Sequence, residues 1–128
     1  MKVFFDNNIS RKIPRALQEL FIDTHEIVHL TDKFERNVSD KTWIEELSKE
    51  GNWIVISADF RITKNYAEKM AFRASKLTGL FMTSRLSDKK PHIQAYRILS
   101  LWEKIEQLQK IVEPGSTYQI SETKIRQL

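Results

Sequence analysis

The chain has 128 residues, of which 41% are hydrophobic and 30% charged, and its formal net charge is +4. These values are typical of one globular domain and exclude a disordered chain. No apolar run approaches the roughly 20 residues of a membrane-spanning helix. The absence of cysteine excludes a disulfide framework and thiolate metal sites. We therefore expect a single domain over residues 1–128 that is cytoplasmic and not associated with a membrane.

Charge is distributed unevenly along the chain. Residues 61–90 contain eight lysines or arginines and two acids, whereas residues 1–60 contain eight basic residues and eleven acids. This asymmetry is compatible with a polyanionic partner such as a nucleic acid. It is equally compatible with lysines scattered over a solvated helix face.

The first half of the chain alternates predicted strands with predicted helices. Short apolar or β-branched runs indicate strands at residues 3–5, 26–30 and 53–57. Between them, apolar residues at helical spacing predict one helix that begins after Ser10. They predict a second helix that begins at Ser39 or Asp40 and ends at Gly51. The polar stretch of residues 31–38 is predicted to be a loop.

The second half of the chain continues this alternation. A helix is predicted over residues 64–76 and a strand over residues 80–82, and Pro91 opens the longest predicted helix. The apolar stripe of that helix consists of Ile93, Tyr96, Leu99, Trp102, Ile105 and Leu108. Residues 117–120 predict a last, edge strand. Because single helices connect successive strands, we expect an α/β fold with a mainly parallel central sheet flanked by helices.

Three aspartates are expected to meet at one edge of this sheet. Asp6 follows the first strand, Asp59 follows the third, and Asp40 opens the helix that leaves the second strand. Because open sheets bind ligands at the carboxyl ends of their parallel strands, we expect the carboxylates of Asp6 and Asp59 within roughly 8 Å of each other. Clustered carboxylates favour Mg²⁺ or Mn²⁺, which activate water for attack on a phosphodiester.

Each acid also has a purely structural interpretation. Asp6 can terminate a strand or form an Asx turn with Asn8, and Asp40 can simply stabilise the first turn of its helix. Glu45 and Glu46, about one turn further along, are alternative third ligands or members of a solvated helix face. The sequence therefore leaves the choice between Asp40 and Glu45 open.

Polar and basic residues near the acids are candidates for substrate binding. Asn8 can hold a metal-bound water. Arg11, Arg61 and Lys64 can contact a nucleic-acid backbone or neutralise charge at a cleaved phosphate. The same cations can instead offset the acid cluster, since structural ion pairs near carboxylates are common.

Four segments of the chain resemble the VapC-type PIN-like toxins, a compact branch of the PIN superfamily. These segments are Met1–Ser10, Ile27–Leu30, Ser39–Trp43 and Trp53–Asp59. The long helix after Pro91 and the tail near Pro114 also fit, so the resemblance covers nearly the whole chain.

The resemblance implies a PIN-like three-layer domain and a Mg²⁺- or Mn²⁺-dependent endoribonuclease that acts on RNA, typically the toxin of a type II toxin–antitoxin pair. It assigns metal ligation and catalysis to Asp6, Asp40 and Asp59, with Asn8 as a helper. It further implies a protein antitoxin as partner and self-association as a homodimer. The chain departs from ordinary PIN domains at Asp40, where a helical Glu is usual, and at residues 61–65, which lack the fourth acid often found there.

Two other functions are compatible with the sequence. A receiver-like phosphoacceptor would also place Asp6, Asp59 and Thr83 after the first, third and fourth strands, although receivers pair two adjacent acids after the first strand. A non-catalytic module that binds a metal or a basic partner through the same acids is the second alternative. Three glycines and no glycine-rich loop disfavour a Rossmann or Walker nucleotide site.

Overall fold

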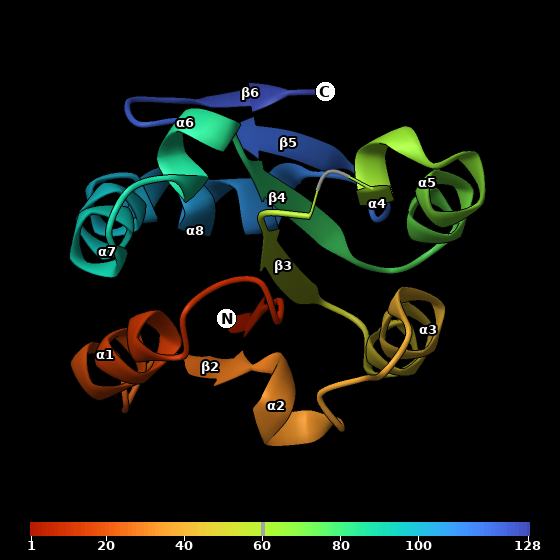
Figure 1. The fold of residues 1–128 in the computed structure, drawn as a ribbon, viewed down its shortest axis with the longest axis horizontal. Helices are drawn as coiled ribbons and strands as arrows, with labels where there is room; N and C mark the ends of the chain where they lie inside the picture. The colour runs from red at the N-terminus through yellow and green to blue at the C-terminus, as the bar shows by residue number, and fades with distance from the viewer. Residues whose placement is uncertain (60) are drawn as a thin grey trace.

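A mainly parallel β-sheet forms the centre of the structure, a computed structural model that describes residues 1–59 and 61–128 (Figure 1). Within these ranges the sheet has six strands in the order β2-β1-β3-β4-β5-β6. The strands are β1 (Lys2–Phe5), β2 (Glu26–His29), β3 (Trp53–Ser57), β4 (Thr78–Met82), β5 (Thr117–Ile120) and β6 (Ile125–Gln127). Neighbouring strands from β2 to β5 are parallel, and β6 runs antiparallel to β5.

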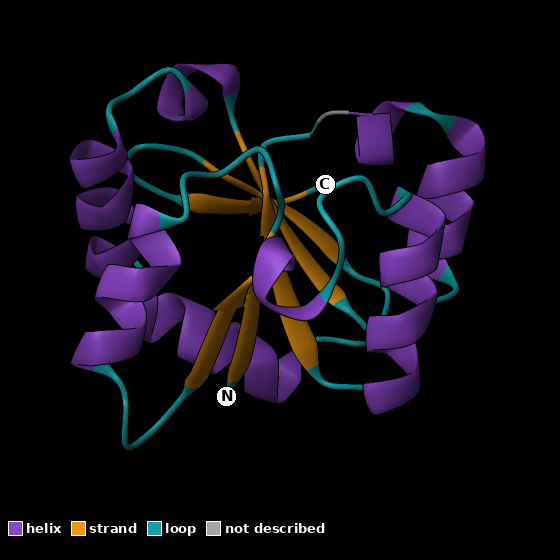
Figure 2. Ribbon diagram, turned by 60° about the horizontal axis from the view of Figure 1, so that its bottom comes forward, coloured by secondary structure: helices purple, strands orange, loops and turns teal. Residues whose placement is uncertain are grey.

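Helices cover both faces of the sheet, which confirms the predicted α/β fold and gives it three layers (Figure 2). One face carries α1 (Lys12–Leu20), α7 (Pro91–Ser100) and α8 (Trp102–Ile111), and the other carries α3 (Asp40–Glu50) and α5 (Tyr66–Arg73). The one-turn helices α2 (Leu30–Lys33), α4 (Arg61–Lys64) and α6 (Ser84–Ser87) follow strands β2, β3 and β4. Across the described ranges, every helix is too short or too polar to cross a lipid bilayer.

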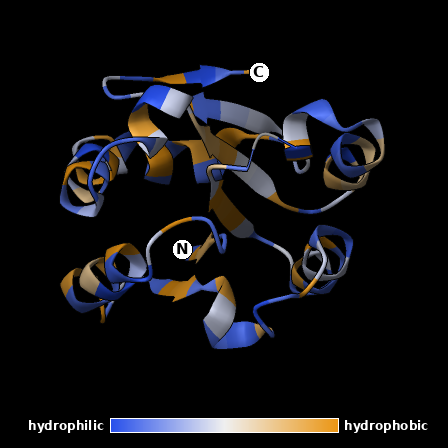
Figure 3. Ribbon diagram, in the orientation of Figure 1, coloured by the Kyte–Doolittle hydropathy of each residue, from blue (hydrophilic) through white to orange (hydrophobic). Residues whose placement is uncertain are grey.

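Two apolar cores fill the spaces between the sheet and its helix layers. Because successive side chains of a strand point to opposite faces, Phe5 and Ile56 pack toward α1, α7 and α8, whereas Phe4 and Val55 pack toward α3 and α5. Strand β3 is accordingly hydrophobic on both faces, while the outer helices mix hydrophobic and hydrophilic residues (Figure 3). Trp43 of α3 stacks on Phe4 with ring centroids 5.2 Å apart, so the start of α3 is fixed against β1.

The strand order reverses between β1 and β3. After β1 the chain crosses to β2 on one side, and after β2 it crosses back to β3 on the other side of β1. In sheets with this order, the connections that leave the two strands diverge and open a crevice at the carboxyl ends. Asp6 directly follows β1, and Ala58 and Asp59 follow β3, so the fold places both acids at this crevice.

The structure corrects the prediction of a loop over residues 31–38. Strand β2 ends at His29 instead of Leu30, and the one-turn helix α2 follows it. The His29 ring accepts a hydrogen bond from the Thr31 amide, and the Asp32 carboxylate accepts one from the His29 amide. Together they form a capping box. The sequence does not predict this helix because histidine is not among the usual N-cap residues.

The C-terminal half also differs from the prediction. The predicted long helix is interrupted at Leu101, which separates α7 from α8. The Ser100 hydroxyl donates to the Arg97 carbonyl at 2.7 Å and competes there with the helical hydrogen bond. Tyr96, expected in the buried stripe, is exposed. Strand β5, predicted to be an edge strand, is covered by β6.

Candidate metal centre

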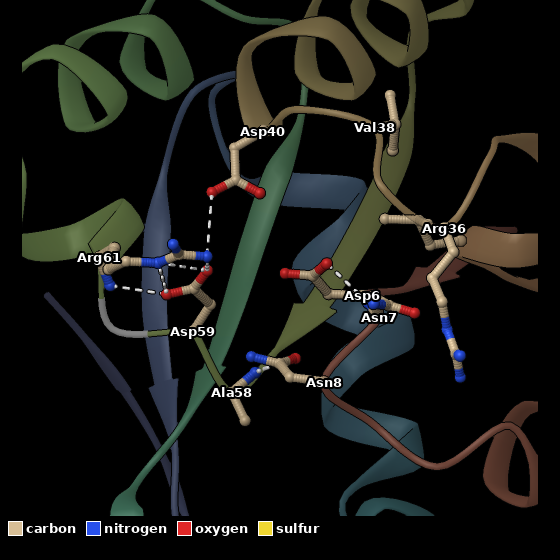
Figure 4. A pocket seen from close by; sticks show the side chains of 10 residues that line it. Asp6, Asn7, Asn8, Arg36, Val38, Asp40, Ala58, Asp59 and Arg61 are labelled. Atoms are coloured by element: carbon tan, nitrogen blue, oxygen red, sulfur yellow. Dashed lines mark hydrogen bonds and ion pairs between the residues drawn. The ribbon is translucent and has the colours of Figure 1, made fainter.

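Three carboxylates converge at the carboxyl edge between β1 and β3 (Figure 4). One oxygen from each of Asp6, Asp40 and Asp59 lies within 4.8 Å of the other two, which confirms the predicted closeness of Asp6 and Asp59. The pocket around them has a volume of about 490 Å³ and is lined further by Asn7, Asn8, Leu30, Arg36, Val38, Ala58 and Arg61.

Asp6 and Asp59 are held at this edge through one buried hydroxyl group. The Ser57 hydroxyl donates to Asp6 Oδ2 at 2.8 Å and accepts from the Asp59 amide at 2.9 Å. The Asp6 amide extends the β1–β3 ladder by donating to the Ile56 carbonyl at 2.9 Å. The other Asp6 oxygen accepts from the Asn7 amide at 2.7 Å. Asp6 is therefore fixed from two sides, and only 4% of its surface is exposed.

Asp40 reaches the pocket from the first turn of α3. The cap of this helix is Ser39, whose hydroxyl accepts from the Thr42 amide at 3.1 Å, so the Asp40 carboxylate is not needed there. Its Oδ1 accepts from the Trp43 indole at 3.0 Å, and its side chain is 16% exposed. Glu45, the competing third ligand, instead lines a separate pocket together with Ala71 of α5 and residues 74–76.

The Arg61 guanidinium lies over the exposed side of the acids. Its Nε is 3.0 Å from Asp59 Oδ1, and its Nη2 is 2.6 Å from Asp59 Oδ2 and 3.8 Å from Asp40 Oδ2. The Arg61 amide also donates to the Asp59 carboxylate at 2.9 Å. The Arg61 side chain is 74% exposed, whereas that of Asp59 is 11% exposed. Arg61 thus acts as a counter-charge for Asp59 in this structure.

The acids that follow β1 and β3 have pKa values shifted in opposite directions. Burial raises the pKa of Asp6, and the charges of Asp40 and Asp59 add to the rise, although its two hydrogen bonds oppose it. Hydrogen bonds from Arg61 lower the pKa of Asp59 and outweigh the effect of its partial burial. The negative charge of Asp6 would therefore gain more from a bound cation than that of Asp59.

A fourth acid that the sequence does not predict, Glu68 of α5, approaches the cluster. Burial raises the pKa of Glu68, and the charge of Asp40 and a hydrogen bond between the two carboxyl groups raise it further. Asn65 caps α5, which begins later than predicted, so Glu68 has the spacing of a capping-box residue. However, the Asn65 amide donates to the Arg61 carbonyl at 2.7 Å, and the Glu68 carboxyl is turned toward Asp40.

The cluster fits a divalent cation that prefers oxygen ligands. An octahedral Mg²⁺ with bonds of about 2.1 Å spans at most about 4.2 Å between opposite ligands. The three carboxylate oxygens lie within 4.8 Å of one another, which is close to that span. Asp6, Asp40 and Asp59 would therefore hold the ion after a small inward movement or with one contact through a metal-bound water, and Glu68 would support Asp40 from behind.

The other predicted residues are distributed over several pockets. Asn8 lies in the pocket of the acids, where its Oδ1 accepts from a backbone amide of the loop after β3 at 3.2 Å. Arg11 lines an adjoining pocket and Lys64 a third pocket. Among the residues that the structure describes, the lining of the acid pocket includes neither of them. Glu46 forms an exposed ion pair with Lys49 and is not among the described residues that line the acid pocket.

Replacement of Asp6 by Asn should stabilise the metal-free protein at neutral pH. Because the pKa of Asp6 is raised by folding, the folded state binds the proton more tightly than the unfolded state. The stability of the native protein therefore falls as the pH rises above the ordinary carboxyl pKa through the folded-state value. We expect the melting temperature of Asp6→Asn at pH 7 in chelator to rise by a few degrees, since about 1 kcal/mol corresponds to roughly 4 °C in a domain of this size.

The matched variant Asp59→Asn should shift stability in the opposite direction. The pKa of Asp59 is lowered by Arg61, so its carboxylate contributes stability above the ordinary carboxyl pKa and loses it as the pH falls through the folded-state value. Thermal denaturation from pH 3 to pH 8 measures both effects. A lower melting temperature for Asp6→Asn at pH 7 in chelator would contradict the assignment of uncompensated charge to Asp6.

Comparisons with known proteins agree with this geometry. A family model described as PIN like domain matches residues 1–84, a range that contains β1 to β4, the three acids of the cluster and Glu68. No curated protein and no solved structure matches the chain. The family match does not distinguish the VapC-type branch from other PIN-like proteins. It covers well over half of the chain, and the chain therefore belongs to the PIN-like domain family.

Proposed function

We propose that this chain is a Mg²⁺- or Mn²⁺-dependent endoribonuclease that hydrolyses RNA phosphodiester bonds. PIN-like domains are generally nucleases, so the family match supports nuclease-type activity. The observation that carries the proposal is the convergence of Asp6, Asp40 and Asp59 at the β1–β3 crevice. Such a cluster of carboxylates is suited to a divalent cation rather than to a covalent intermediate.

In this proposal the residues of the pocket divide the work between positioning and charge stabilisation. A bound divalent ion would polarise the phosphodiester and lower the pKa of the attacking water. Asp6 and Asp59 would hold the ion in a fixed place because the Ser57 hydroxyl ties them together. The amide of Asn8 faces the same pocket and can orient a water molecule. The exposed guanidinium of Arg61 can move from Asp59 to the phosphate and neutralise the charge that develops there.

RNA cleavage should depend on Mg²⁺ or Mn²⁺. Its rate should fall by about 100-fold or more in Asp6→Asn and in Asp59→Asn, because loss of a residue that only supports a metal ligand already lowers activity by about 10- to 100-fold. Asp40→Asn should also be severely impaired. The measurement is cleavage of a fluorescent single-stranded RNA by purified protein. Glu45→Gln is the matched control, because it removes one acid from α3 outside the pocket, and it should retain full activity.

Two results would count against this mechanism. Undiminished cleavage by Asp6→Asn protein, or by the native protein in excess chelator, would indicate a contaminating nuclease or a metal-independent reaction. Loss of activity in Glu45→Gln equal to that in Asp40→Asn would indicate that α3 contributes through its charge in general and not through one ligand.

Arg61→Ala should bind Mn²⁺ more tightly in the absence of RNA and cleave RNA more slowly. The guanidinium neutralises Asp59 and lies near Asp40, so a metal ion must compete with it. Because Arg61 is largely exposed, the gain should be about twofold to fivefold, the equivalent of an exposed ion pair. Titration calorimetry with Mn²⁺ measures it, and Arg61→Lys serves as the charge-retaining control. Weaker Mn²⁺ binding by Arg61→Ala would mean that Arg61 helps to build the metal site.

The same activity fits the toxin of a type II toxin–antitoxin pair, with a protein antitoxin as its partner and self-association as a homodimer. The physical support is the acceptance of a guanidinium group by the acid pocket, which Arg61 already demonstrates within the chain. A basic side chain of a partner protein could occupy the pocket in the same way and displace the metal ion.

Expression of the chain alone should arrest growth, and co-expression of the protein encoded next to it should relieve the arrest and yield a copurified complex. The Asp6→Asn protein should not arrest growth when expressed alone. It should still copurify with the partner, because Asp59 and Asp40, the acids that Arg61 contacts, remain to accept a basic side chain. Absence of both relief and copurification would reject the toxin–antitoxin assignment while leaving the nuclease activity to be judged by RNA cleavage.

A receiver-like phosphoacceptor has less support. Its strand order is the same as that found here, but a shared topology does not establish function. The Thr83 hydroxyl accepts from the Leu86 amide at 3.2 Å and caps α6, which gives this residue a structural role. The family match favours the nuclease over this alternative and over a non-catalytic binding module.

A further inference from the structure

A second pocket adjoins the acid pocket on the side away from Arg61. It has a volume of about 500 Å³ and shares Asn7, Asn8 and Arg36 with the lining of the acid pocket. In Figure 4, Arg36 lies on the opposite side of Asp6 from Arg61, and its guanidinium points away from the acids. The two pockets therefore form one continuous surface that crosses the loop after β1.

Four basic side chains line this second pocket. Arg11, Lys12 and Arg15 come from the start of α1, and Arg36 comes from the segment between α2 and α3. All four residues are exposed. Within the described part of the chain, no acid lines the pocket, and none of these four cations forms an ion pair with an Asp or Glu. Unpaired cations without neighbouring acids create a positive potential that attracts polyanions.

His29 lies buried beside these cations and is affected by them. Burial lowers the pKa of His29, and the positive charges of Arg11 and Arg15 lower it further. The hydrogen bond to Ile9 and the charge of Asp32 have the opposite effect and raise it. Its Nδ1 accepts from the Thr31 amide at 3.2 Å, so the neutral ring carries its proton on Nε2 and donates to the Ile9 carbonyl at 2.9 Å. The loop between β1 and α1 is thus fixed before any ligand arrives.

We propose that this basic pocket, defined by Arg11, Lys12, Arg15 and Arg36, binds the phosphodiester backbone of single-stranded RNA beside the cleaved bond. The proposal rests on the ribonuclease function proposed above. The acids of the adjoining pocket repel phosphate, so affinity must come from cations that lie next to them and are not already paired. Arg61 is paired with Asp59, whereas the four residues of the basic pocket are available to phosphate oxygens.

A third pocket gives an alternative path for the RNA. It is lined by the basic residues Lys64, Lys69 and Arg73 together with Phe72, Phe81 and Met82. In the ranges that the structure describes, its lining shares no residue with that of the acid pocket. An RNA strand in the basic pocket can reach the acids directly, which favours that pocket. Lys69 and Arg73, both exposed, provide a matched pair for a control variant.

The test measures RNA binding separately from cleavage. Fluorescence anisotropy of a labelled single-stranded RNA is recorded in chelator over a salt series, with Asp6→Asn protein as the background. Arg15→Gln/Arg36→Gln is compared with Lys69→Gln/Arg73→Gln, which removes the same charge. Removal of one phosphate-binding cation should weaken binding about fivefold at 0.1 M salt and reduce the log–log salt slope by about 0.7. The basic-pocket pair removes two such cations, so we expect its affinity to fall about 25-fold and its salt slope to fall by about 1.4. The control pair should change the affinity less than twofold. Melting curves verify that both variants fold.

Three outcomes would overturn the proposal. An equal decrease of affinity in both pairs would mean that RNA responds only to net charge, and a decrease confined to the control pair would assign the RNA to the third pocket. Unchanged RNA binding in the basic-pocket pair would also overturn it. If that variant in addition no longer copurifies with the co-expressed neighbouring protein, the pocket is a protein interface. A different result would reject the ribonuclease function. In that case the native chain would show no metal-dependent cleavage, although its RNA binding would still depend on the basic pocket.

Discussion

Repulsion among carboxylates at the β1–β3 edge is the constraint on which the arrangement of the site depends. Each acid is compensated by a different local interaction. Asp6 accepts hydrogen bonds from Ser57 and Asn7. Asp40 lies at the positive N-terminus of α3, where the helix dipole favours a negative charge, and Asp59 pairs with Arg61. The compensation of Asp6 is incomplete because it is buried and its hydrogen bonds come from neutral groups.

The positions of two of these acids follow from the sequence, whereas that of the third requires the structure. Asp6 and Asp59 each come directly after an apolar run, and parallel pairing of the two strands brings their carboxyl ends together whatever the details of packing. Asp40 and Glu45 lie on the same helix, so the choice between them depends on how the helix begins and rotates. Capping by Ser39 and packing of Trp43 against the sheet fix both, and neither is set by a local pattern alone.

The site residues that the sequence does not predict share a physical cause. Glu68 has capping-box spacing, and only the competing use of the Asn65 amide frees its carboxyl to approach Asp40. Arg36 reaches the acid pocket because α2 turns the chain after β2, and that turn depends on His29 acting as a helix cap. Both placements depend on which side chain or carbonyl satisfies the amides at the start of a helix, which hydrophobic periodicity and residue propensity do not encode.

The loop between β1 and α1 connects the chemistry of the two adjoining pockets. At one end it begins with Asp6, which is held by the β1–β3 ladder and by Ser57. In its middle, the Ile9 carbonyl accepts the proton of His29 Nε2, and at its other end Arg11 enters the basic pocket. Backbone hydrogen bonds and one buried ring therefore fix the backbone of this short segment between Asp6 and Arg11. In the proposed ribonuclease, a phosphate bound in the basic pocket would thereby set the position of its neighbour at the acids, as in-line attack on a phosphodiester requires.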